Sequence, residues 1–255
     1  MIKFFRKIRY NLMETGKTTK YFKYAIGEII LVVIGILIAL QVNNWNEKRL
    51  QNQNKKELTK ALLKDFEDNK DILKLKLNYT DGLVSRLTRF LHISDKPEIE
   101  ISRDSIKYYA TAAFMSNHLK LRLDTYNQAL NTGELNTFKN QKLIAFFSDF
   151  FMQLNFYEGH MRIAGNEFYQ GSIYELRKQI GNLDNLDDYG EYSTRVHFTT
   201  HAMTYKELVN FIGKKEVFAV FHNQLTIQYN FKESLEKIMI VNDSIVKQLK
   251  KELND

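Results

Sequence analysis

The chain has 255 residues, 44% of them hydrophobic, which suits one or two folded domains and excludes an intrinsically disordered chain. Eleven glycines and a single proline, Pro97, suit long helices and disfavour an all-β fold, which needs turn residues about every 8–12 positions. Cysteine is absent, which excludes disulfides, thiolate metal sites and a cysteine nucleophile. The composition therefore favours an all-α fold.

The net charge of +7 is concentrated at the N-terminus. Residues 1–23 hold seven of the 37 basic side chains and one of the 30 acidic ones, so the rest of the chain is close to neutral. A nucleic-acid-binding domain would carry its own basic face, whereas a basic tail beside an apolar segment is typical of a membrane surface. We therefore expect no nucleic-acid partner.

The first 14 residues have the pattern of a basic amphipathic helix. Met1, Phe4, Phe5, Ile8 and Leu12 fall on one face, with the basic side chains outside it. Such a helix is expected to lie on the anionic cytoplasmic leaflet of a membrane. The alternative is a helix docked on the protein's own body. Residues 1–23 are interpreted as a cytoplasmic tail.

Residues 24–45 have the pattern of a transmembrane helix. Eighteen residues from Ile29 to Asn46 carry no charge, and the eleven Ile, Leu and Val side chains up to Val42 favour insertion by roughly 3–7 kcal/mol. Glu28 opposes insertion, but near the end of the segment a carboxylate can reach the headgroups. Aromatic residues, among them Trp45, flank both ends, as expected at the two membrane interfaces.

Two other readings of this segment are a buried core helix and a cleaved signal peptide. No small-x-small cleavage site follows the apolar run, and the basic region before it is long, so an uncleaved signal anchor is favoured. Basic residues are equally frequent near both ends of the segment and do not set its orientation. Because a compact basic tail is costly to translocate, we expect the N-terminus in the cytoplasm and residues 46–255 in the periplasm.

The first part of the body is predicted to be helical and broken by short connections. Apolar residues recur every three or four positions from Leu58 to Leu91, which predicts a long amphipathic helix that could continue from the anchor and stop near Pro97. Ser102 is expected to cap a short helix that reaches Phe114. Asp124 is expected to cap another, over 125–132, with Gly133 as a left-handed C-cap.

An aromatic-rich helix is expected to open at Asn136 or Thr137, with helical character to about Ile180. Residues 181–193 are read as an acidic loop and 195–200 as a short strand or extended segment. A helix capped by Thr204 is expected to end at Gly213.

The last helix, predicted over 215–253, carries a nearly strict heptad seam of buried positions. Two polar members, Gln228 and Asn242, would fix the register at some cost in stability. This helix is the natural antiparallel partner of 58–91, so we expect residues 46–255 to form an elongated bundle with coiled-coil-like helices. The seam consists of Val217, Phe221, Gln224, Gln228, Phe231, Leu235, Ile238, Asn242, Ile245 and Leu249.

Catalytic motifs for nucleotide, hydrolase or metalloprotease chemistry are absent from the sequence. His197 and His201 have a metal-like spacing only if helical, and the intervening Phe-Thr-Thr disfavours a helix. The acidic loop fails the calcium-loop spacing, and Glu158 beside His160 is typical of a helix surface. We therefore expect no enzyme, and no catalytic, cofactor-binding or metal-binding residues.

Two further features each have a functional and a structural interpretation. Gly35 and Ala39 form a small-x-x-x-small pair in the anchor, which suggests close approach of a second helix, although such pairs also arise by chance. The 18 Phe and 14 Tyr residues could line a ligand pocket or fill a core.

Residues 1–9, 20–28 and 35–47, and more weakly 125–135, resemble an uncharacterised family of single-pass membrane proteins from Gram-negative bacteria. The resemblance implies an inner-membrane anchor with a helical body. The family has no assigned activity, so it implies no functional residues.

The function expected is that of a membrane-anchored helical interaction or scaffold protein, with the lipid bilayer and a protein partner or second copy as partners. The alternative is a periplasmic ligand-sensing bundle that passes a signal through its anchor, which predicts a pocket of roughly 300 Å³ or more. A third alternative, an enzyme with an unrecognised site, would need a pocket that gathers His160, His197 or His201 with a carboxylate.

Overall fold

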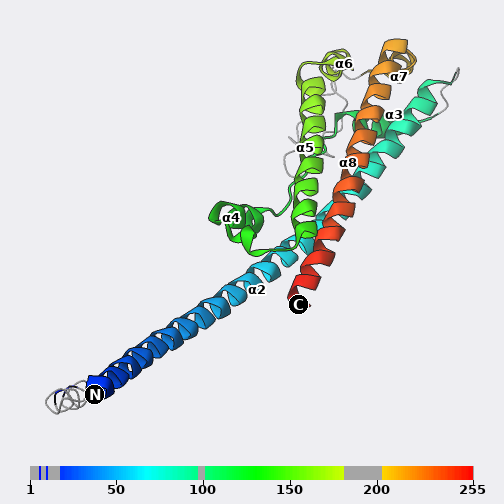
Figure 1. Ribbon diagram of the computed structural model, residues 1–255. Coiled ribbons are helices and arrows are strands. Elements are labelled where there is room, and N and C mark those ends of the chain that lie inside the picture. The colour runs from blue at the N-terminus through cyan, green and yellow to red at the C-terminus, as the bar shows by residue number, and fades with distance from the viewer. Residues whose placement is uncertain (1–5, 7–9, 11–17, 97–100, 181–202, 255) are drawn as a thin grey trace, which may run out of the picture. The chain divides into compact units, whose positions relative to one another are not determined.

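The computed structural model describes residues 6, 10, 18–96, 101–180 and 203–254, and every regular element within these ranges is a helix (Figure 1). The prediction of an all-α fold is confirmed for this part of the chain. The chain divides into two compact units, Met1–Glu57 and Leu58–Asp255. The predicted amphipathic tail, the acidic loop 181–193, the extended segment 195–200, His197 and His201 lie outside the described residues, apart from Arg6, Tyr10 and 18–23.

The N-terminal unit holds the first part of helix α2 (Thr18–Ser94). This helix includes one segment near the N-terminus that is long and apolar enough to cross a membrane, with a mean hydropathy of 2.6 and none of it buried. Its Ile, Leu and Val side chains from Ile26 to Val42 are exposed. The prediction of one apolar N-terminal helix is confirmed, and it is continuous with the amphipathic helix expected over 58–91.

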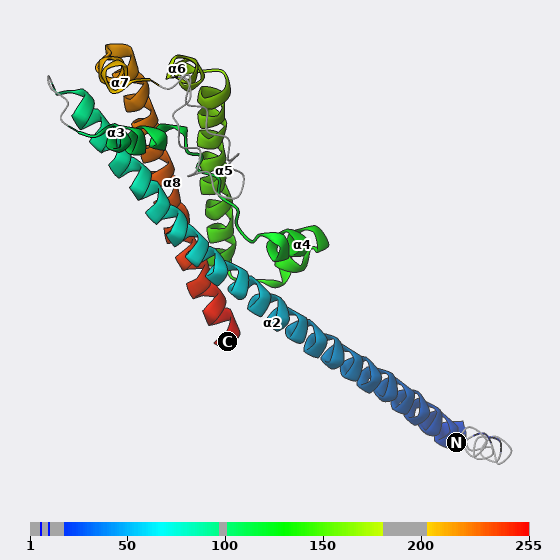
Figure 2. The same cartoon turned by 180° about the vertical axis from the view of Figure 1, so that it is seen from behind.

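The second unit combines two more long helices, α5 (Gln141–Tyr169) and α8 (Lys215–Asn254), with the part of α2 from Leu58 onward. Figures 1 and 2 both show α5 alongside α8, with α6 and α7 at the end where α8 begins and α4 near the start of α5. The short elements are α3 (Arg103–Ala110), η1 (Thr111–Phe114), α4 (Asp124–Thr132), η2 (Glu134–Thr137), α6 (Ser172–Ile180) and α7 (Tyr205–Ile212).

Side chains along α2 and α8 pair in opposite sequence order. Glu67 meets Lys250 at 2.7 Å, Lys70 meets Asp243 at 2.9 Å and Asp81 meets Lys232 at 2.7 Å. Farther along, the Phe90 ring stacks on that of Phe221, with centroids 3.8 Å apart. The two helices therefore run antiparallel within this unit. All ten seam positions predicted on the last helix are buried.

Three of the predicted helix ends are confirmed. The Ser102 hydroxyl accepts a hydrogen bond from the N–H of Ser105 and caps α3, although the α-helix tightens to the 3₁₀ helix η1 at Thr111. Gly133 is left-handed, with φ of 76°, and ends α4. Thr204 and Glu207 form a reciprocal capping box at the start of α7, and the hydrogen bonds from Thr204 hold the pKa of Glu207 below its usual value.

Two predicted helix starts are wrong. Asp124 is the first residue of α4, and Leu123 stands at the cap position without a side-chain hydrogen bond. Its carboxylate favours the helix start through the dipole. The aromatic helix starts at Gln141, because Asn140 accepts from the N–H groups of Lys142 and Leu143, whereas 134–137 form the 3₁₀ helix η2.

Helical structure does continue to Ile180, but with a break after Tyr169. The Glu167 carboxylate accepts hydrogen bonds from the N–H (3.0 Å) and hydroxyl (2.6 Å) of Ser172, and so it caps the new helix, α6.

Two separate apolar clusters form the interior of the second unit. One, here called the α7 cluster, joins the end of α2 (Leu83 to Ile93) to α3, η1, α6, α7 and the start of α8 (Val217, Phe221). The other, the α5 cluster, joins α2 from Leu62 to Leu73 with α4, α5 and α8 from Ile227 onward. The part of α2 between Leu73 and Leu83 contains the buried Thr80, so a polar layer lies where the two clusters approach each other.

Candidate functional site: a cavity beside a buried polar layer

Residues 115–123 connect η1 to α4 without helical structure, yet Asn117 within them is buried. Buried backbone N–H and C=O groups need partners, and an extended segment among helices must obtain them from side chains. Asn69 of α2 supplies both: its amide nitrogen donates to the carbonyl of Arg122 at 2.9 Å, and its oxygen accepts from the N–H of Arg122 at 2.7 Å. The Tyr79 hydroxyl donates to the carbonyl of Ser116.

Asn117 is the centre of the polar layer. Its amide nitrogen donates to the hydroxyl of Thr80 at 2.9 Å and to the side-chain oxygen of Gln228 at 3.1 Å. The Thr80 hydroxyl in turn donates to the carbonyl of Lys76 at 2.9 Å. All three side chains are buried, so one network ties α2, the extended segment and α8 together. In a low-dielectric interior such a network is strong only while every member keeps its partners.

Tyr157 of α5 anchors the same segment from the other side. Its hydroxyl donates a short hydrogen bond to the carbonyl of Asn117. Burial raises the pKa of the Tyr157 phenol well above its usual range, so the group stays a neutral donor at any physiological pH. The Asn117 backbone and side chain are therefore held by α2, α5 and α8 together.

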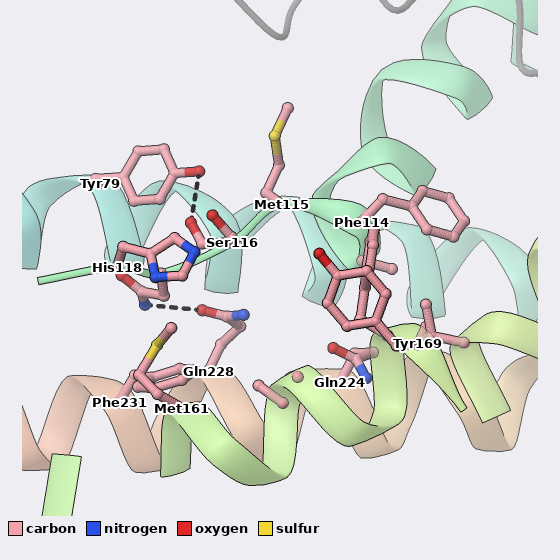
Figure 3. Close-up of a pocket in the computed structure, with 16 residues that line it drawn as sticks. Tyr79, Phe114, Met115, Ser116, His118, Met161, Tyr169, Gln224, Gln228 and Phe231 are labelled. Carbon is pink, nitrogen blue, oxygen red and sulfur yellow. Dashed lines mark hydrogen bonds between the residues drawn. The ribbon is translucent and has the colours of Figure 1, made fainter. Parts of the chain in front are cut away.

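Next to this layer lies a cavity of about 510 Å³. Its walls come from the end of η1, the extended segment, α5, α6 and α8, with Tyr79 of α2 at one side (Figure 3). The lining residues are Tyr79, Ala113, Phe114, Met115, Ser116, Asn117, His118, Met161, Ala164, Gly165, Phe168, Tyr169, Ile173, Gln224, Gln228 and Phe231.

Two carboxamides on α8, Gln224 and Gln228, form the polar part of one wall. Both are at least 95% buried, and Figure 3 shows them reaching from the helix toward the cavity. Gln228 uses its oxygen to accept from Asn117. No hydrogen bond joins the Gln224 amide to any of the described residues. The Gln224 amide, in the cavity wall, can offer both an oxygen acceptor and N–H donors to a molecule bound there.

The other walls are aromatic and apolar. Phe114, Tyr169 and Phe231 contribute rings to the lining, and Figure 3 shows Met161 beside Phe231 and Met115 next to Ser116. Among the described residues that line the cavity, none is Asp, Glu, Lys or Arg. Two of the lining rings contact cations: the Lys76 ammonium lies over Tyr79 at 4.7 Å, and the Arg177 guanidinium lies over Phe168 at 4.4 Å. Burial lowers the pKa of Lys76.

The described lining combines aromatic rings, thioethers and carboxamides. Among the described residues, no group of three or more His, Cys, Asp or Glu side chains is placed to hold a metal ion. Glu158 is exposed on α5, and His160 lies with its ring edge-on to Phe231, 6.3 Å away, outside the cavity lining. The structure therefore does not bring these two residues to the cavity.

Only part of this site is predicted by patterns in the sequence. The heptad pattern indicated that Gln224 and Gln228 are buried, and both line the cavity. It gave no sign of Asn117, because a residue in a non-helical connection follows no period. Phe147, Phe150 and Tyr157, which fill the α5 cluster, lie outside the lining, whereas Phe168 and Tyr169 farther along α5 are part of it.

Comparison with known proteins adds no relative: no family model matches the chain, and neither a curated protein nor a solved structure matches it significantly. The function is therefore inferred from the chain's own residues.

Proposed function

We propose that this chain is a membrane-anchored protein whose helical unit binds a small molecule in the cavity between η1, α5 and α8. The observation that carries the proposal is the 510 Å³ cavity with the carboxamides of Gln224 and Gln228 in its wall. Ligand sites have volumes of about 300–1,000 Å³, mostly apolar linings and a few convergent polar groups. The cavity has each of these properties.

Anchorage is the second part of the proposal. The apolar segment of α2, the basic residues before it and the resemblance to single-pass proteins of Gram-negative bacteria support an inner-membrane anchor over residues 24–45. The N-terminus lies in the cytoplasm and the helical unit, with the elongated antiparallel bundle expected from its heptads, lies in the periplasm.

The topology is tested by fusing alkaline phosphatase or a fluorescent protein after Asp255. Active phosphatase with a dark fluorescent fusion supports a periplasmic C-terminus. A bright fluorescent fusion with inactive phosphatase would place the helical unit in the cytoplasm and overturn this part of the proposal.

Ligand binding is tested with a cavity-filling variant and a matched control. A Cβ added at Gly165, in the cavity wall, or at Gly82, exposed on α2, meets open space, so both accept a larger residue. The full chain is purified in lipid nanodiscs and examined by native mass spectrometry for a bound small molecule. We expect the molecule to be retained by the wild type and Gly82→Leu and lost from Gly165→Leu. If the wild type and both variants retain the molecule equally, the cavity is not its binding site.

A second candidate function is a scaffold that binds another protein, with no catalysis. An exposed apolar stripe along α5 favours it: Ile144, Met152, Phe156 and Ile163 are exposed, and Leu130 of α4 adds to the same groove. Apolar patches of this kind mark interaction sites in many proteins. Double substitution Met152→Lys with Phe156→Lys is expected to abolish partner capture or self-association, measured by cross-linking in the native membrane, and to leave ligand retention intact.

A further inference from the structure

We infer that the cavity selects an uncharged molecule with a flat, unsaturated body and one polar edge that both donates and accepts hydrogen bonds, as a carboxamide does. This inference rests on the proposed ligand-binding function and adds the chemical class of the ligand.

The described lining residues carry no Asp, Glu, Lys or Arg side chain, which indicates the charge of the ligand. Burying an ion is costly unless a partner of opposite charge meets it. Among the residues that the structure describes, none in the lining supplies a carboxylate, ammonium or guanidinium group, and the Lys76 and Arg177 cations lie over the rings of Tyr79 and Phe168. His118 is exposed, and Figure 3 shows it at one end of the cavity, near Tyr79 and Ser116. A charged ligand would lose its water without gaining a buried counter-charge.

The two carboxamides of α8 define the polar edge. Gln224 and Gln228 are four residues apart, which places their Cβ atoms about 6 Å from each other on one helix face. The oxygen of Gln228 is committed to Asn117, so that side chain can offer its N–H groups, whereas Gln224 can offer both its oxygen and its N–H groups. A ligand edge complementary to these two side chains carries a hydrogen-bond acceptor and a donor side by side. A ligand without such an edge would cover the Gln224 amide without forming hydrogen bonds to it.

The aromatic walls define the body. Phe114, Phe168, Tyr169 and Phe231 present rings, and Met115 and Met161 present polarisable thioethers that pack well against ring faces and edges. A flat conjugated ring system is the shape that makes stacked and edge contacts with four such side chains. A cavity of about 510 Å³ has room for two fused rings and their substituents.

The absence of cysteine from the chain makes a direct test possible. A single cysteine is introduced at Ala164, which lines the cavity, in the full chain in lipid nanodiscs, and its rate of alkylation by a maleimide is measured. The control is Leu75→Cys, at a side chain 71% exposed on α2 and outside the lining. The probes are naphthalene-2-carboxamide, naphthalene-2-carboxylate and naphthalene, which share one ring system and differ in the polar edge.

We expect the carboxamide to slow alkylation at Ala164→Cys, and not at Leu75→Cys, at a concentration at least tenfold below that needed for the carboxylate or for naphthalene. Adding Gln224→Met, an apolar side chain of similar length, is expected to abolish the preference for the carboxamide while protection by naphthalene remains. Retained naphthalene protection also shows that the variant keeps the cavity.

Three results would overturn the inference. Equal protection by carboxylate and carboxamide would refute an uncharged ligand, and equal protection by naphthalene would refute the polar edge; both would leave the proposed binding function standing. If the preference for the carboxamide is unchanged by Gln224→Met, Gln224 does not recognise the polar edge of the ligand. If no probe protects Ala164→Cys at any soluble concentration, the inference and the proposed function fail together.

Discussion

The α7 cluster and the α5 cluster are built from the same two long helices but by different means. In the α7 cluster, short elements with small residues (Ala110, Ala112, Ala113) let helices approach closely around one stacked ring pair, Phe90 on Phe221. In the α5 cluster, rings from three long helices meet at tilted and edge-on angles, as Phe66 does with Phe150 at 5.2 Å. The first depends on short helices held at their ends, and the second on continuous helical surfaces.

The difference explains where the cavity lies. Apolar packing fills each cluster, but the polar layer of Thr80, Asn117 and Gln228 lies between them. The hydrogen bonds from Asn117 fix the distances to Thr80 and Gln228, so the elements around the layer do not pack together as closely as apolar side chains alone would allow. Small residues of α5 at Ala164 and Gly165 face this junction. Space is therefore left where the two modes of packing meet.

The largest effect is expected in the α5 cluster. Phe150→Ala removes a fully buried ring that contacts Phe66 and Phe151, and large-to-small changes of this kind cost about 3–5 kcal/mol. Urea unfolding of the full chain in nanodiscs, followed by far-UV circular dichroism, measures the change. A single lowered transition would mean that the two clusters unfold together, whereas two transitions would show that they are independent.

Loss of the Tyr157 hydroxyl should weaken the layer between the clusters. Tyr157→Phe leaves the buried carbonyl of Asn117 without its donor, at a cost of about 1–3 kcal/mol. The folded-state pKa of Tyr157 is raised, so its contribution is complete below about pH 10, the ordinary tyrosine value, and is lost as the pH rises further. The wild type and the variant should therefore converge in stability in alkaline unfolding curves. Parallel curves up to pH 12 would contradict this role.

Substitution of Asn242, unlike the two changes above, is expected to stabilise the protein. Its amide donates to the carbonyl of Phe66 at 2.9 Å, but its buried oxygen has no partner among the described residues. Asn242→Leu removes that unsatisfied group from the α5 cluster and should raise the free energy of unfolding by about 1 kcal/mol. Denaturant midpoints measure it. Destabilisation would instead show that the register of α2 against α8 depends on this amide.

The smallest effect is expected at the edge of the α7 cluster. Thr204→Ala removes the capping box of α7, which typically costs about 1 kcal/mol. Because the pKa of Glu207 is lowered in the folded state, its contribution is present above the ordinary glutamate pKa and is lost as the pH falls through the folded-state value. Hydrogen exchange of α7 amides should therefore differ between wild type and variant at neutral pH and converge in acid. A difference that persists unchanged in acid would exclude Glu207 as the source.

The sequence by itself determined what depends on neighbours along the chain. Helix periodicity placed α8 and its buried seam, hydropathy located the apolar segment of α2, and cap chemistry located Ser102, Gly133 and Thr204. These features follow from contacts three or four residues apart and from local backbone preference. Local patterns also gave a wrong prediction: the N-cap of α5 is Asn140 and not Asn136, because several polar residues in this stretch can serve as an N-cap.

The tertiary structure alone decided what depends on residues far apart in the chain. Residues 115–123 are hydrogen-bonded by side chains from three helices: Asn69, Thr80, Tyr157 and Gln228. No periodicity or motif in the sequence predicts these contacts. Asn117 gains its role because a buried, non-helical backbone must find partners among side chains. The cavity beside it exists because hydrogen-bonded side chains keep a fixed separation between two clusters that apolar packing would otherwise join.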